Sequence, residues 1–225
     1  MPTFNIVPTP QNAVGYMRVV FTNSGTSFNT KSEIYRRQIN EYAGQFILIG
    51  QFAASGGGTF LDYNVANGLS YDYFGRAYDG SGNTSDTAVA SAAMGFSNSW
   101  IHNTVKAVEG QNLYGSALEL YTPESHDRQI VFNNQAQLFA GNAKPDVEVS
   151  EIEDGSWQIP VIIPARDDSK RTVLRTIYET RRPIVFRTPN GTKVLGVLRE
   201  LTERYQTAQT EIVLRLEQTC YSEAI

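Results

Sequence analysis

The chain has few of the residues that build disulfides and metal sites. Cys220 is the one cysteine among 225 residues, which excludes an intrachain disulfide framework and a metal site made of cysteines alone. The two histidines, His102 and His126, are isolated and cannot supply a three-ligand metal site without carboxylates. We therefore expect neither a bound metal nor a cofactor.

Long hydrophobic runs are missing as well. No apolar run approaches the roughly 18 residues that a membrane-spanning helix requires. Residues 1–5 (Met-Pro-Thr-Phe-Asn) have neither the basic start nor the apolar segment of a signal peptide. The sequence therefore predicts a protein that is made in the cytoplasm and has no membrane span.

Positive charge is also scarce. The chain has 19 Lys and Arg residues against 23 Asp and Glu residues, a net charge of −4. A protein whose main partner is nucleic acid normally carries a concentrated basic patch. The one Arg-rich stretch, residues 166–187, is interleaved with acidic residues (Asp167, Asp168 and Glu179), which is typical of the solvated face of a helix. We expect no nucleic-acid partner.

Small polar and aromatic residues are abundant instead. Gly, Ser, Thr, Asn and Tyr are frequent, while charged residues make up 19%, below the usual share of about a quarter. The hydrophobic content of 41% is enough for a real core, and the length suits one or two domains. This composition is typical of a turn-rich, mainly β protein.

The first module, residues 1–94, is predicted to contain seven short strands separated by polar turns. Asn67-Gly68 marks a tight turn, and the residues at positions 71, 73, 75 and 77 alternate onto one face. The predicted strands cover residues 4–8, 14–21, 33–37, 45–52, 59–63, 71–79 and 85–91. Seven strands at this spacing indicate a β-sandwich.

This module resembles a fibronectin type III domain. Residues 32–37 (Ser-Glu-Ile-Tyr-Arg-Arg) and 46–50 resemble the central strands of that family, and residues 62–73 resemble its turn into the sixth strand. Residues 76–85 continue the match through the final hairpin. The resemblance implies that Tyr71 forms a tyrosine corner, with a hydrogen bond back across the turn. Phe21 stands where the family usually has Trp, and Gly75 stands where an inward Val is expected.

A polar linker is expected at residues 92–99, followed by a β-rich second module at residues 100–225 with one helix at about residues 168–180. Asp167 or Asp168 can cap this helix, whose apolar residues recur at helical spacing. Strands are predicted at residues 103–108, 113–121, 128–132, 146–152, 156–163, 183–188, 193–199 and 209–218. In the last of these, Ile212, Leu214 and Leu216 share one face, as in a half-buried strand.

The second module resembles the closing half of minor and distal tail proteins of siphophages. The resemblance lies in residues 173–178 (Val-Leu-Arg-Thr-Ile-Tyr), residues 182–191 with their Arg-Thr-Pro-Asn-Gly turn, and residues 210–216. Residues 100–103 (Trp-Ile-His-Asn) are similar to the Trp-Leu-His-Asp-Pro opening of such proteins, although Thr104 replaces the proline. The resemblance implies a barrel-like sheet with a helix packed across it, and a place in the virion.

No group of residues indicates catalysis. Ser125, His126 and Asp127 are the residue types of a catalytic triad, but they are consecutive in the sequence. Consecutive strand residues point to opposite faces, so a polar turn is the simpler interpretation. The spacing of Asp79, Ser81 and Asn83 resembles the opening of a calcium loop but lacks its glycine and its Glu, so we predict a hairpin turn. The acidic residues 151, 153 and 154 precede Gly155, which favours a solvated hairpin over a glycosidase pair. We expect no catalytic residues.

These observations lead to one main hypothesis and two alternatives. The main hypothesis is a structural protein of a phage tail or tail tip that binds other tail proteins and copies of itself, in a ring or a trimer. The first alternative is an adhesion module that recognises a glycan of the host envelope, and the second is a polysaccharide-degrading enzyme that uses Glu151 and Asp154. The residues proposed for an interaction surface are Tyr42, Tyr78, Arg182, Arg187, Asn190 and Arg215.

Overall fold

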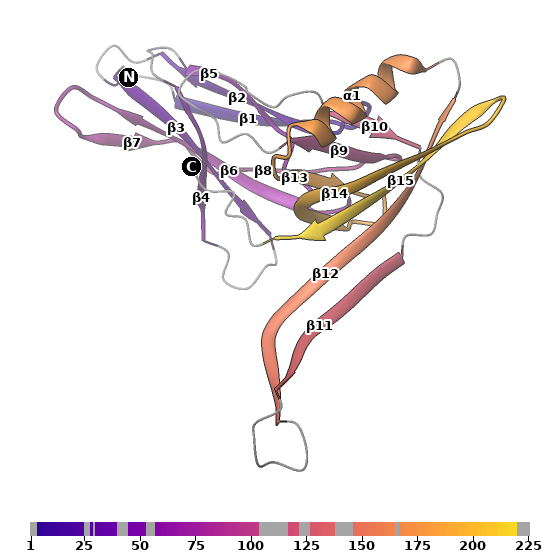
Figure 1. Cartoon of the computed structure of the whole chain (residues 1–225). Helices are drawn as coiled ribbons and strands as arrows, with labels where there is room; N and C mark the ends of the chain where they lie inside the picture. The colour runs from indigo at the N-terminus through magenta and orange to yellow at the C-terminus, as the bar shows by residue number, and fades with distance from the viewer. Residues whose placement is uncertain are drawn as a thin grey trace. The chain divides into compact units, whose positions relative to one another are not determined.

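The computed structural model describes residues 4–24, 28, 30–39, 45–52, 57–103, 117–121, 127–137, 146–164 and 167–219, and for residues 127–137 and 146–155 it describes the backbone. The described part contains fifteen strands, all paired antiparallel, and one helix (Figure 1). The predicted mainly β fold with a single helix is therefore confirmed. The chain forms two compact units: Met1–Leu120 with Ile184–Val194 and Tyr221–Ile225, and Tyr121–Pro183 with Leu195–Cys220.

Two sheets of the first unit correspond to the predicted sandwich. One sheet has the order β1 (Phe4–Gln11), β2 (Tyr16–Asn23), β5 (Gly57–Asp62). The other has the order β4 (Ile47–Phe52), β3 (Lys31–Gln38), β6 (Ser70–Tyr78), β7 (Thr84–Asp86), and β8 (Ala90–Ala93) also pairs with β6. The strand predicted at residues 85–91 is thus two short strands along one edge of β6. They separate at Thr87, whose backbone N–H donates to Gly75 O at 2.9 Å and whose Oγ1 accepts from Gly75 N at 3.0 Å.

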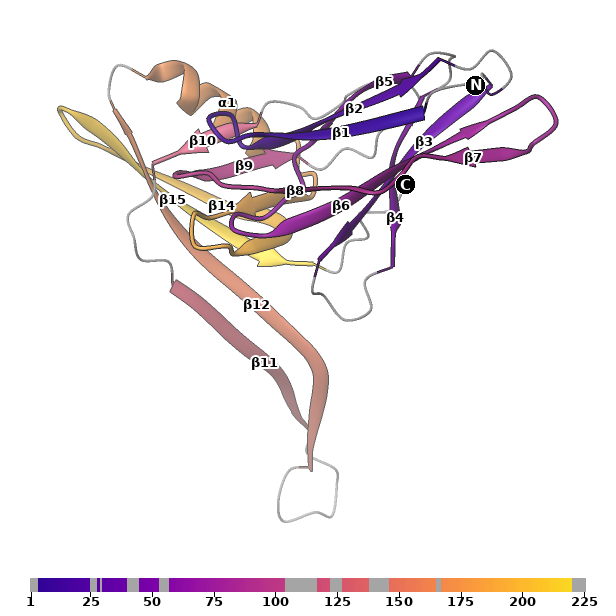
Figure 2. The same cartoon turned by 180° about the vertical axis from the view of Figure 1, so that it is seen from behind.

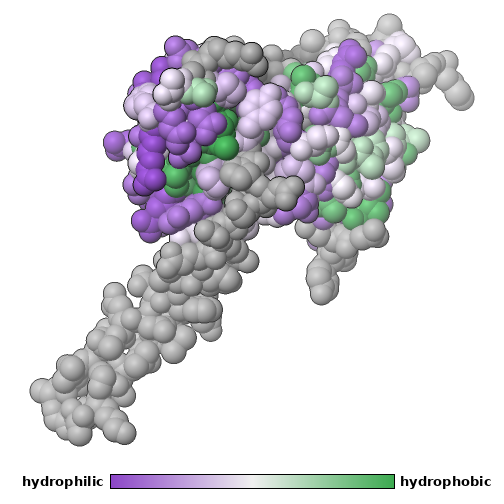
Figure 3. All heavy atoms as spheres, turned by 90° about the vertical axis from the view of Figure 1, so that its right-hand side faces the viewer, coloured by the Kyte–Doolittle hydropathy of each residue, from purple (hydrophilic) through white to green (hydrophobic). Residues whose placement is uncertain are grey.

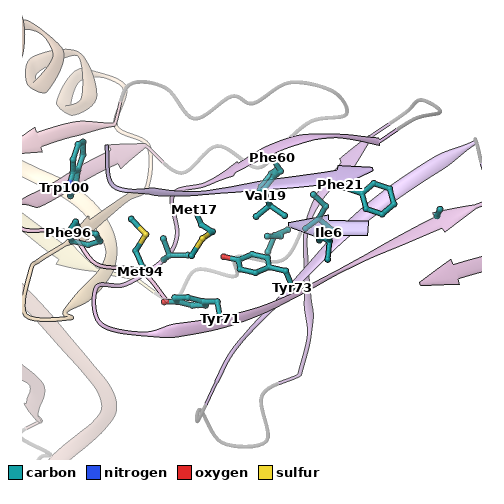
Figure 4. Close-up of a cluster of buried hydrophobic side chains, with 14 residues drawn as sticks. Ile6, Met17, Val19, Phe21, Phe60, Tyr71, Tyr73, Met94, Phe96 and Trp100 are labelled. Carbon is teal, nitrogen blue, oxygen red and sulfur yellow. The ribbon is translucent and has the colours of Figure 1, made fainter. Parts of the chain in front are cut away.

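The core of the first unit lies between these two sheets (Figure 4). Met17, Val19 and Phe21 of β2 point toward Tyr71 and Tyr73 of β6, and all five side chains are at most 1% exposed. Such a fully buried contact between two sheets is what an alternating strand pattern provides.

Phe21 and Gly75 lie against each other in this core. A Cβ atom at Gly75 would lie 2.3 Å from Cδ2 of Phe21, so the ring occupies the space of the missing side chain. The hydrogen bond expected of Tyr71 is present, because its hydroxyl accepts from the backbone N–H of Ala66 at 2.7 Å.

The predicted linker at residues 92–99 is part of the same core, which is a correction. Met94 and Phe96 are 2% and 5% exposed, and they continue the hydrophobic cluster to Trp100 (Figure 4). Trp100 belongs to β9 (Ser99–Asn103), which pairs with β10 (Leu118–Leu120) and β13 (Ile184–Arg187) in the first unit. The compact units therefore do not divide at the expected boundary between residues 94 and 100.

The second unit contains the strand order β14 (Lys193–Tyr205, from Leu195 on), β15 (Gln209–Gln218), β12 (Asp146–Pro164), β11 (Asp127–Gln137). The alternation predicted for the last strand is confirmed: Ile212, Leu214 and Leu216 are at most 1% exposed, while Val213 and Arg215 face solvent.

Helix α1 (Asp168–Glu179) follows β12 and agrees with the helix predicted at about residues 168–180. It buries Leu174 and Ile177. Asp167 stands at the N-cap but makes no side-chain capping hydrogen bond, and Asp168 instead pairs with Arg171 at 2.7 Å. The helix is joined to β14 by Arg175, whose Nε and Nη2 lie 2.6 Å from the Glu203 carboxylate oxygens.

Candidate interaction surfaces

Strand β12, the longest of the described strands, extends beyond its neighbour β15 in the sheet. Two strands were predicted at residues 146–152 and 156–163, with a hairpin before Gly155. That prediction is wrong, because β12 is one strand of 19 residues that runs straight through this glycine. Its second half, Ser156–Pro164, pairs with β15, and its first half pairs with β11.

The outer part of this hairpin has no third strand among the described residues. It consists of residues 130–137 of β11 and residues 146–155 of β12, and we call it the arm. The register runs from Ile130 opposite Gly155 to Gln137 opposite Asp146, with a bulge between Phe132 and Asn134. At about 3.3 Å per residue the arm extends roughly 30 Å past the end of β15. Figures 1 and 2 show it leaving the rest of its unit as a two-stranded ribbon.

A second candidate surface is the outer face of β3 and β6 in the first unit, which we call the aromatic face. Tyr35 and Phe74 stack with their ring centroids 4.6 Å apart, and Phe46 meets Phe74 edge-on at 4.8 Å. The guanidinium groups of Arg37 and Arg76 lie 4.6 Å from the Phe46 ring and 5.4 Å from the Tyr35 ring. Each ring thus already has an aromatic or cationic neighbour, which leaves less ring surface for a sugar to stack on.

Glu33 holds one end of this aromatic face together. Its carboxylate accepts hydrogen bonds of 2.6 Å from the hydroxyls of Tyr35 and Tyr78, and Lys31 Nζ lies 2.6 Å from it. Burial alone would raise the pKa of Glu33, but these hydrogen bonds outweigh burial and lower it. Burial and the hydrogen bond to Glu33 raise the pKa of Tyr78. The phenol at this predicted site is therefore a neutral donor to Glu33.

A buried ion pair lies behind the same sheet. Arg36 Nη1 is 2.8 Å from both carboxylate oxygens of Asp62, and the two side chains are 4% and 0% exposed. Asp62 also accepts from Tyr73 OH at 2.9 Å and from the backbone N–H of Asn64 at 3.0 Å. With its oxygens bonded in this way, the pair fixes the chain between β5 and β6 and is closed to an external ligand.

Arg187 was expected at an interaction surface, and the structure corrects this. Its side chain is 0% exposed and reaches from β13 to the sandwich, where Nη1 donates to Gly15 O at 2.6 Å and Val65 O at 3.0 Å. Its guanidinium lies 5.3 Å from the Phe96 ring centroid. Burial lowers the pKa of Arg187 to about 10, so the group remains charged at neutral pH. Arg187 is an internal link of the first unit.

His102 of β9 belongs to the same buried region. Its Nε2 lies 3.1 Å from Oδ1 of Asn64, and Lys193 Nζ donates to the backbone oxygen of Asn64 at 3.2 Å. The imidazole is 0% exposed. Burial lowers the pKa of His102 well below its usual value, and the charges of Arg187 and Lys193 lower it further. The ring is therefore neutral at pH 7.

The remaining predicted interaction residues lie on separate elements of the two units. Tyr78 lies on the aromatic face, Asn190 is exposed in the turn before β14, and Tyr42 lies outside the described residues. In the second unit, Arg182 is exposed just after α1 and Arg215 is exposed on β15. The arm was missed because Gly155 was interpreted as a turn, although strand-forming residues stand on both sides of this glycine.

The predicted hairpin turn at Asp79 is confirmed. Its carboxylate accepts hydrogen bonds from the backbone N–H groups of Ser81 and Asn83, both at 2.8 Å, and from Asn83 Nδ2 at 2.7 Å. These bonds lower the pKa of Asp79, that with the Asn83 side chain most strongly. Across the described ranges, no group of three or more His, Cys, Asp or Glu side chains could hold a metal ion. His126 and Cys220 are outside those ranges.

Exposed hydrophobic side chains are scattered over the described surface. They are Val7, Val14, Val89, Tyr121, Tyr205 and Val213. In the view of Figure 3, hydrophobic areas are separated from one another by hydrophilic residues. Scattered residues of this kind are ordinary on a protein surface. Within the described residues, no helix is both long and apolar enough to cross a membrane.

Two comparisons with known proteins found no relative of this chain. No protein-family model matches the chain, and no curated protein matches it.

Proposed function

We propose that this chain is a structural protein of a phage tail or tail tip that works by assembling with other protein subunits. The arm carries the proposal. A two-stranded ribbon is at best marginally stable in water by itself, and an open strand edge readily pairs with or packs against another chain. A ribbon of this length in a folded protein is therefore best explained by a protein partner that covers it.

The resemblance to tail proteins supports a phage tail as the place where the assembly occurs. The parts that carry it are the helix at residues 168–179, the Arg-Thr-Pro-Asn-Gly turn and the alternating strand β15. A helix beside a sheet, and a sandwich-like unit with Tyr71 bonded across its turn, are consistent with that resemblance. The glycan-binding alternative stays a prediction, since Tyr42 is outside the described residues and Tyr78 already bonds Glu33.

The direct test is to remove the arm without disturbing the sheet. Gln129 lies opposite Ser156, so replacing residues 130–155 by Asn-Gly would close the two strands with a two-residue turn. We expect the intact chain to form oligomers or to bind other tail proteins, measured by sedimentation velocity and by native mass spectrometry. The armless chain should lose this association while its circular dichroism and melting temperature stay close to those of the intact chain.

Two results would contradict the proposal. One is an intact chain that stays monomeric at high concentration and binds no tail component. The other is an armless chain that associates as strongly as the intact one.

A further inference from the structure

The arm and the region around helix α1 carry opposite charges. The outer half of β12, Asp146–Gly155, has five carboxylates and no Lys or Arg: Asp146, Glu148, Glu151, Glu153 and Asp154. Residues 166–182, which include α1, have six cations and three carboxylates, a net charge of +3. Opposite surfaces of this kind steer two protein chains together and fix how they meet.

The two regions do not meet within one chain. They belong to the same unit and are joined by the second half of β12, the nine residues Ser156–Pro164, which span roughly 30 Å. Figures 1 and 2 both show α1 and the outer part of the arm at opposite ends of this unit. Since charges in solution are screened beyond about 8 Å at physiological salt, the two regions do not neutralise each other within one chain.

Charge also decides against a contact between two identical arms. Two β12 edges side by side would pair segments that each have five carboxylates and no cation, and like charges on an edge are a common way in which proteins prevent such pairing. A basic surface is the complementary partner. The rest of the arm does not change this, because residues 127–155 together carry six carboxylates and two cations.

The cations best placed to receive the arm follow the end of α1. Arg181 and Arg182 are exposed, whereas Arg171 pairs with Asp168 and Arg175 with Glu203. Lys170 lies over the Tyr121 ring at 4.3 Å. Arg182 is also among the residues that the sequence proposed for an interaction surface.

We infer that the arm of one copy binds the basic end of α1, at Arg181 and Arg182, on the next copy of this chain. The contact is head-to-tail, so it leaves one arm and one helix end free in any open chain of subunits. Such a contact produces a closed ring if the rotation between subunits closes, and a filament if it does not. This inference rests on the proposed function and names its partner and its orientation.

Charge reversal tests the pairing. The arm variant E148K/E153K and the helix variant R181E/R182E should each raise the dissociation constant of self-association about tenfold or more, measured by sedimentation velocity at low salt. The chain with all four changes should recover, and an equimolar mixture of the two double variants should recover as well, because each then offers the charge that the other requires. The intact assembly should weaken at about 1 M salt, where the screening length falls to about 3 Å.

The matched control is R204E, which reverses an exposed arginine of β14 in the same unit and should leave assembly unchanged. The melting temperature of every variant shows that a loss of assembly is not a loss of folding.

The failures are distinguishable. Self-association that survives both double variants, or a mixture that does not recover, overturns this inference and leaves the proposed function standing. A chain that is monomeric alone but binds another tail protein through the arm would also overturn this inference and leave the proposed function standing. A chain that is monomeric and binds no tail component overturns the proposed function itself.

Discussion

At the residue scale, Gly15 connects the first hairpin turn to the rest of the first unit. Its φ angle is +69°, a Cβ atom there would lie 2.6 Å from Trp100 Cδ2, and its backbone oxygen accepts from Arg187. Gly68 has nearly the same φ angle, +71°, with no atom within 4 Å of the position of a Cβ. Substitutions at these two glycines therefore distinguish the cost of backbone strain, present at both, from the cost of crowding, present only at Gly15.

We predict that Gly68→Ala costs about 1 kcal/mol, the usual price of placing alanine in the left-handed region. Gly15→Ala should cost about 3 kcal/mol, because displacing the Trp100 ring adds an overpacking term of about 1–3 kcal/mol. Urea unfolding of the two variants measures both values. Equal destabilisation would show that Trp100 does not pack on Gly15.

His102 should make the stability of the protein depend on pH. Its pKa is lowered in the folded state by burial and by Arg187 and Lys193, while the unfolded value is about 6.5. Below pH 6.5 the unfolded chain binds a proton that the folded chain does not, so the free energy of unfolding falls by up to about 1.4 kcal/mol per pH unit. Above pH 6.5 this contribution to stability is complete.

Chemical unfolding between pH 7 and 5 measures this effect, with His102→Gln as the comparison. Glutamine keeps a donor toward Asn64 and cannot titrate in this range. The variant should lose most of the pH dependence that His102 causes, and a profile equal to that of the unchanged chain would assign the effect to other groups.

Contacts between residues close in the sequence could be predicted better than contacts between distant residues. The Tyr71 hydrogen bond spans five residues and follows from the turn that it closes. Arg187 bonds Gly15 and Val65, which are 172 and 122 positions away, and nothing in the neighbouring sequence of Arg187 distinguishes it from an exposed arginine. Its burial depends on the assembled sheets, so the prediction failed there.

At the element scale, strand β12 shows why boundaries were harder to predict than strand identity. The strand-forming residues on both sides of Gly155 were recognised, and the final strand was predicted at its observed bounds of Gln209–Gln218. Glycine weakens a strand without ending it when partners on either side supply the hydrogen bonds. Gly155 pairs with Ile130 of β11, and the sequence alone does not reveal this pairing.

We predict a step in hydrogen exchange along this single strand. Residues 156–164 pair with β15 and include the buried side chains Ile159, Val161 and Ile163, so their amides should exchange slowly. Residues 146–155 pair with β11 alone and should exchange faster in the monomer. Exchange measured by mass spectrometry on peptides from each half checks this, and uniform protection of the monomer along β12 would contradict it.

At the scale of the whole molecule, the first unit is built from distant parts of the chain. Residues 1–94 were expected to form the sandwich, followed by a linker. Met94, Phe96 and Trp100 instead extend its core toward β9, and Ile184–Val194 returns from the C-terminal half to complete the unit. The strand spacing predicted the sandwich and did not indicate that later segments would join its core.

The fragment of residues 1–94 should therefore be much less stable than the same residues in the whole chain. It lacks the Trp100 ring that packs on Gly15 and the Arg187 donor that binds Gly15 O and Val65 O, and it exposes part of the hydrophobic cluster. Each buried acceptor left without a donor costs about 1–3 kcal/mol, and a fully buried aromatic side chain contributes a similar amount. Domains of this size have about 5–15 kcal/mol in total, so these losses remove a large share of it. Thermal unfolding of the fragment should give a low melting temperature or no cooperative transition. A fragment that melts as the full chain does would show that the sandwich is independent of β9 and β13.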